Sequence, residues 1–96
     1  MKAVSDQEII DCAILLDSDL GELCFEKLRD MLGAEPTRVA LLTPLFDAEL
    51  DPSLRTALAI VIVSVTDYEP AKIWLAENDG WTVPDFKASR ERFRPR

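Results

Sequence analysis

Three carboxylates spaced four residues apart are the side chains best placed to act together in this 96-residue chain. Glu22, Glu26 and Asp30 would lie about 6 Å apart along one side of a helix, because positions i and i+4 face the same way. Like charges at this spacing destabilise a helix by about 0.2–0.5 kcal/mol per pair. Such a cost can be retained where a partner binds the charges, so this acidic ridge predicts contact with a basic surface. The alternative is a solvated face that Arg29 partly neutralises.

Two more carboxylates, Glu8 and Asp11, fall on the preceding helix, opposite its apolar stripe. They would frame Leu15, for which both an exposed and a buried position are open because this helix is apolar nearly all round. Trp81 follows a turn signal and precedes an extended segment, where an aromatic side chain can anchor a partner. Its alternative is a lid folded back on the core. We therefore predict partner contacts at Glu8, Asp11 and Trp81 as well as at the acidic ridge.

The C-terminal residues have the opposite charge to the rest of the chain. Residues 1–85 carry seventeen acidic and six basic side chains, a net charge of −11, whereas residues 86–96 carry five basic and one acidic, a net charge of +4. We expect a single helical domain over residues 1–86 and a basic tail over 87–96, either disordered or lying against the acidic body. The alternative is that the tail contacts nucleic acid, because arginine pairs with phosphate and phenylalanine stacks on bases. The residues for that contact would be Lys87, Arg90, Arg92 and Arg94.

The residue types that catalysis most often needs are absent or unsuitably spaced. The chain has no histidine, the commonest general base near neutral pH. Its two cysteines, Cys12 and Cys24, lack the paired spacing of a zinc site, and we expect them to be reduced thiols in the core. The three glycines form no phosphate-binding motif. We therefore expect a protein that is not an enzyme and that holds no metal and no cofactor.

The overall charge limits the kinds of partner. A net charge of −7 argues against a body that grips DNA or anionic lipid, because phosphate contacts need lysine and arginine. The longest uncharged run, residues 56–66, is much shorter than the roughly 20 residues of a membrane helix. No signal peptide is evident at the start of the chain. We expect a cytoplasmic protein without a membrane partner.

Helical signals dominate the first third of the chain. Ser5 with Glu8 forms a capping box, and apolar residues at intervals of three and four predict a helix that ends around residues 16–18. Asp19 with Glu22 repeats the capping pattern for a second helix, which Gly33 would end by taking a positive φ. The apolar stripe of the second helix comprises Leu20, Cys24, Leu28 and Met31. The short link predicts an antiparallel hairpin.

Prolines preceded by polar residues punctuate the next segment. They predict short helices near 36–42 and 44–50 and a longer one over 52–66. Residues 57–65 are the main ambiguity, because five of the nine are Ile or Val, which suit a strand as well as a buried helix. The capping signal at Asp51-Pro52 favours the helix.

The last third of the chain predicts one further helix near 70–78, which Gly80 stops. Residues 81–84 should be extended, and one or two more turns should follow within 85–93. We predict a mostly α protein, a compact single-domain bundle of about five to six short helices around a buried helix near 52–66. The alternative fold is α+β, with residues 58–65 as a strand.

These features favour a small, acidic, non-catalytic protein that engages a basic surface on a protein partner. The most specific form is an inhibitor or antidote of a nucleic-acid-handling protein, which would cover the surface that normally meets phosphate. Phage-encoded inhibitors of host defence, such as anti-CRISPR proteins, and immunity or antitoxin proteins share this size and charge. One alternative is a structural or adaptor subunit that forms homo-oligomers through Phe25, Trp81 and Phe86. Another is a DNA-associated regulator that uses the basic tail.

Overall fold

The segment whose pattern suits both helix and strand is helical. In the computed structural model, which describes residues 5–93, helix α4 runs over Pro52–Val65. The Asp51 side chain accepts a hydrogen bond from the Leu54 N–H at 3.3 Å, so the predicted cap is present. The alternative of a strand at residues 58–65 is wrong, because this segment satisfies its backbone groups within the helix and residues 5–93 hold no strand to pair with.

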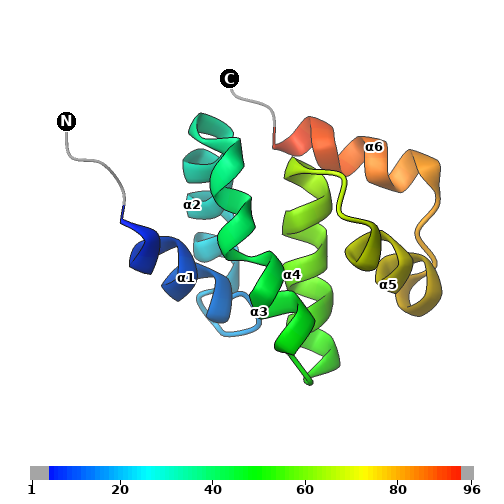
Figure 1. Ribbon diagram of the computed structural model, residues 1–96, viewed down its shortest axis with the longest axis horizontal. Coiled ribbons are helices and arrows are strands. Elements are labelled where there is room, and N and C mark those ends of the chain that lie inside the picture. Colours follow the sequence, from blue (N-terminus) through cyan, green and yellow to red (C-terminus); the bar gives the residue numbers. More distant parts are fainter. Residues whose placement is uncertain (1–4, 94–96) are drawn as a thin grey trace.

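Helix α4 is the centre around which the other elements pack. Its residues 58, 59 and 61–64 are buried, and most of the other elements pack directly against it. The elements around it are α1 (Asp6–Ile14), α2 (Gly21–Ala34), the 3₁₀ helix η1 (Pro36–Leu41), α3 (Thr43–Ala48), α5 (Glu69–Asp79) and α6 (Val83–Arg92). Helices α1 and α2 lie on one side of α4, and α5 and α6 lie on the other (Figure 1). The prediction of a mostly α bundle around a buried helix is confirmed.

The hairpin of α1 and α2 forms by a different turn from the one predicted. One half of the capping box predicted for α1 is present, because the Ser5 Oγ accepts from the Glu8 N–H at 3.2 Å. Asp19 does not cap α2. Instead, the Ser18 hydroxyl donates to the Leu15 carbonyl and accepts from the Leu20 N–H. This turn is so tight that a Cβ at Gly21 would collide with the Leu16 carbonyl oxygen.

The two predicted glycine stops have different outcomes. Gly33 does not end α2, which continues through Ala34. Gly80 does end α5, with a φ of 66°, the single positive φ among residues 5–93. The Trp81 N–H then donates to the Leu75 carbonyl at 3.1 Å, which closes the end of the helix. The short helix predicted near 36–42 is the 3₁₀ helix η1.

Helix α6 covers part of the segment predicted to be extended and part of the predicted tail. Thr82 is extended, but the helix begins at Val83, because the Asp85 carboxylate accepts from the Thr82 N–H at 2.8 Å and fixes the first turn. The expectation of an extended chain over residues 81–84 is therefore wrong for its second half. Ser89 and Phe93 are buried, and Phe93 packs edge-on against Phe25 of α2 at 5.1 Å between ring centroids. Helix α6 thus crosses the expected boundary between domain and tail and docks on the core.

Candidate functional site

A groove between α1 and α2 brings together two of the predicted partner-binding carboxylates. Glu8 and Asp11 line it from α1, and Lys27 lines it from α2. Its volume is about 400 Å³, and its remaining walls are apolar: Cys12, Leu15, Leu20, Leu23, Cys24 and Met31. Gln7 orients Asp11 by donating to its carboxylate at 2.8 Å. We call this hollow the acidic groove.

Three leucines are exposed along this groove. The sequence pattern places Leu20 in the core and allows either a buried or an exposed position for Leu15. The exposed fractions are 38% for Leu15, 53% for Leu20 and 50% for Leu23. Leu20 is therefore not part of the buried stripe of α2, because it lies in the turn that precedes the helix. Exposed apolar side chains gathered in a hollow with charged edges are typical of a binding surface. Leu23 carries no signal of its own in the sequence beyond its position between Glu22 and Cys24.

The acidic ridge lies next to the groove. Glu22 and Glu26 are exposed and line a second hollow together with Leu23, Phe25 and Arg29. Leu23 lines both hollows, so it joins the ridge to the groove. Asp30 is also exposed, but Arg29 Nε lies 3.8 Å from its carboxylate, so part of its charge is neutralised. Within the described part of the chain, Glu22 and Glu26 have no cation within ion-pair distance.

The hairpin that carries these side chains is strongly acidic. Residues 5–34 include eight acidic and two basic side chains. One of these acidic residues, Asp6, is already paired, because Arg38 of η1 donates to its carboxylate at 2.7 Å. This bond raises the pKa of the Arg38 guanidinium. Glu8 and Asp11 at the groove and Glu22 and Glu26 on the ridge remain exposed.

Trp81 lies away from the groove, in the link between α5 and α6. Its ring is half-buried and packs on Phe86 with 5.3 Å between centroids, and its Nε1 donates to the Asp79 carboxylate at 2.9 Å. The predicted partner-binding residues therefore fall in two separate places, with Glu8, Asp11 and the acidic ridge on the hairpin and Trp81 beyond α4.

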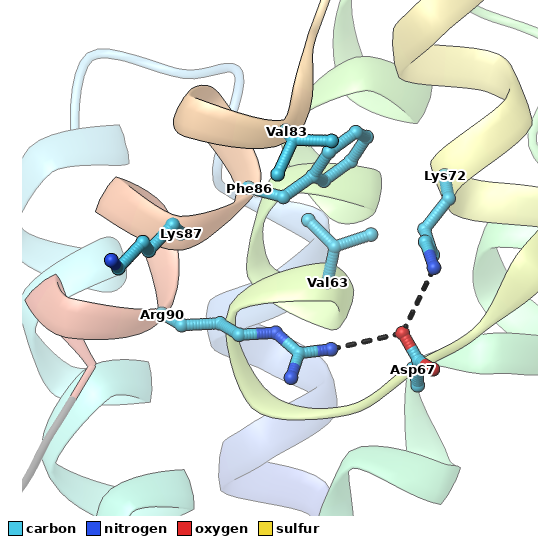
Figure 2. A pocket seen from close by; sticks show the side chains of 7 residues that line it. All are labelled: Val63, Asp67, Lys72, Val83, Phe86, Lys87 and Arg90. Carbon is cyan, nitrogen blue, oxygen red and sulfur yellow. Dashed lines mark hydrogen bonds and ion pairs between the residues drawn. The ribbon is translucent and has the colours of Figure 1, made fainter.

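Three of the four cations predicted for nucleic acid lie on the described part of α6. Lys87 and Arg90 lie on α6 and line a pocket with Lys72 of α5 (Figure 2). Arg92 is exposed at the end of α6, and Arg94 lies outside the described residues. Arg90 donates to Asp67 at 2.9 Å, so one of these cations is already engaged within the chain.

The cysteines differ in accessibility, although both are free thiols. Cys24 is buried, as expected, whereas Cys12 is half-buried and lines the acidic groove. Burial, and next the neighbouring Cys24, raise the pKa of the Cys12 thiol. Among residues 5–93 no group of three or more Cys, Asp and Glu side chains is arranged to hold a metal ion.

This arrangement predicts selective alkylation of the native protein. Iodoacetamide should modify Cys12 before Cys24, and the rate should rise through a midpoint above the ordinary pKa of a cysteine, since the thiolate is the reactive form. Replacing Cys24 by alanine should lower that midpoint, because one cause of the raised pKa is removed. Mass spectrometry of peptides after timed alkylation measures both effects. Equal rates at the two thiols would contradict the described burial.

The fold and the groove define a class: a small protein whose described residues form helices and turns, with an acidic, leucine-lined hollow on one side. No helix within residues 5–93 is long and apolar enough to cross a membrane. No family model, curated protein or solved structure matches the chain.

Proposed function

We propose that this protein binds a basic surface of a protein partner through the acidic groove and the acidic ridge. The observation that carries the proposal is the exposure of Leu15, Leu20 and Leu23 among carboxylates on one hairpin. Carboxylates at the edge steer a basic partner and set its orientation. The leucines become buried against the partner on binding and slow its dissociation.

A protein surface that normally meets phosphate fits this hairpin. Such surfaces present lysine and arginine, whose long aliphatic stems can cover leucine while their charged ends reach carboxylates. Occupying that surface would exclude nucleic acid. We therefore propose an inhibitor or antidote of a nucleic-acid-handling protein, a role that needs binding and no chemistry of its own.

The residues of the self-association alternative are engaged within the chain. Phe25 packs on Phe93, and Trp81 packs on Phe86. All three candidate aromatics are half-buried. The groove leucines are more exposed than these aromatic side chains, which favours the groove as the contact surface.

The test begins with capture of partners from the native host on the immobilised protein, washed at low and high salt. The affinity of the captured protein should fall steeply with salt, because exposed charge pairs are screened. E22Q/E26Q should slow association several-fold, and L23A should speed dissociation. E77Q/E91Q is the matched control, because it removes two exposed carboxylates from α5 and α6.

A second measurement separates inhibition from simple binding. The captured protein should lose affinity for its nucleic acid when this protein is added, and less so when E22Q/E26Q is added. If E8Q/D11Q, E22Q/E26Q and L23A all bind the partner as tightly as the unmodified protein, the hairpin is not the contact surface. If nucleic-acid binding is unaffected by saturating protein, the inhibitor role is wrong.

A further inference from the structure

A pocket on the opposite side of α4 from the acidic groove has the reverse charge. It lies between α4, α5 and α6, and its volume is about 450 Å³. Val83 and Phe86 supply accessible apolar surface next to the buried Val63, while Lys72, Lys87, Arg90 and Asp67 supply the charge (Figure 2). Figure 2 shows Lys72 and Arg90 converging on Asp67, with Phe86 and Val63 beside them. Volumes of this size are common for small-molecule sites.

The cations of this pocket outnumber the carboxylates that face them. Lys72 Nζ and Arg90 Nη2 donate to the same Asp67 oxygen, at 3.0 and 2.9 Å. Lys72 also lies 3.8 Å from the Glu69 carboxylate, and the Asp67 bond raises the pKa of the Lys72 ammonium, which keeps it charged. No ion pair of Lys87 occurs within residues 5–93. Three cations facing two carboxylates leave a positive pocket on a protein whose net charge is −7.

The Asp67 carboxylate shows which chemical group the two converging cations can hold. A single carboxylate oxygen receives donors from both Lys72 and Arg90, and such charge-assisted bonds are stronger than neutral ones. Arg90 is half exposed, with a 51% exposed side chain, so its remaining donors are open to a second anion. The accessible apolar surface of Val83 and Phe86 lies beside these donors.

We propose that this pocket binds a small organic anion with one carboxylate and an apolar body, of the size of a medium-chain fatty acid. The carboxylate meets Arg90 and Lys72, Lys87 adds to the positive potential, and the body covers the accessible surface of Val83 and Phe86. This site is separate from the acidic groove, so its occupancy does not depend on the protein partner. Trp81, which packs on Phe86, reports on it by fluorescence.

The probe is decanoate, titrated into the full chain below the concentration at which it forms micelles. Tryptophan emission should change and amide signals of α5 and α6 should shift in heteronuclear NMR spectra. Decanol, with the same body and no charge, should bind at least about tenfold more weakly, because it lacks the charge-assisted bonds. Decyltrimethylammonium should bind more weakly still.

Variants then locate the site. R90Q and K72Q should each weaken decanoate binding about tenfold, and K87Q, which breaks no described ion pair, should weaken it by a smaller factor. K27Q, on the acidic groove, is the matched control and should bind decanoate as the unmodified chain does. Equal affinities for decanoate and decanol, or full binding by both K87Q and R90Q, would overturn the proposal. NMR shifts confined to α1 and α2 would also overturn it.

Discussion

Replacing Phe46 by alanine should lower the free energy of unfolding by about 3–5 kcal/mol. Phe46 is fully buried in α3, where it packs against α4 and α5. Its ring makes edge contacts with Tyr68 and Trp74, at 6.3 and 6.5 Å between centroids. Removing the ring leaves a cavity that these two rigid side chains can fill only in part.

Replacing Phe46 also removes a contact of the charged side chain of Arg55. The guanidinium of Arg55 lies 4.5 Å from the centre of the Phe46 ring and 4.4 Å from that of Trp74. Its Nε is buried and has no hydrogen-bond partner among residues 5–93. The two aromatic faces therefore stabilise this cation, and alanine at position 46 removes one of them.

Chemical denaturation followed by far-UV circular dichroism measures the effect. Small single domains are typically stable by about 5–15 kcal/mol, so Phe46→Ala should shift the midpoint to much lower denaturant. Phe46→Leu keeps most of the volume and should cost less. Leu50→Ala is the control, because Leu50 is 93% exposed and its loss should change stability by no more than about 0.5 kcal/mol. A Phe46→Ala variant as stable as Leu50→Ala would show that this aromatic cluster is not part of the core.

The core of this fold could be predicted because its signals are local. Asp51-Pro52 is a strong start for a helix, and the capping bond to Leu54 is present. The same rule failed at Asp19, because the shorter side chain of Ser18 both donates to the Leu15 carbonyl and accepts from the Leu20 N–H. A capping pattern therefore locates a helix start to within a residue or two, and the turn geometry decides which side chain performs it.

The position of the candidate site was harder to predict, since it depends on how elements distant in sequence pack. The exposed carboxylates of α1 and α2 follow from helical periodicity. The exposed position of Leu23, which joins the acidic ridge to the groove, does not follow from periodicity, because an apolar residue on a helix is expected to be buried. The pocket beside Asp67 joins α4, α5 and α6 and has no sequence motif at all.

The docking of helix α6 on the core is the packing that was hardest to predict from the sequence, because the basic composition of this segment is typical of a solvated tail. Two small side chains, Ser64 of α4 and Ser89 of α6, are buried where the helices meet, and their hydroxyls are hydrogen-bonded to each other. Ser64 also donates to the Ile60 carbonyl at 2.6 Å. Since a hydroxyl has one hydrogen, Ser89 must be the donor between the two serines.

This direction of donation predicts unequal effects of two similar substitutions. Ser64→Ala leaves the Ser89 hydroxyl buried without its acceptor and should cost about 1–3 kcal/mol, the penalty for an unsatisfied buried polar group. Ser89→Ala removes the donor but leaves Ser64 bonded to Ile60, so it should cost less, about 0.5–1.5 kcal/mol. The double variant should cost less than the sum of the two, because it leaves no unpaired hydroxyl. Denaturation midpoints give all three values, and hydrogen exchange at the amides of α6 shows whether its docking is what weakens. A Ser64→Ala variant more stable than Ser89→Ala would reverse the assigned donor, and unchanged exchange in α6 would show that this pair does not hold the helix in place.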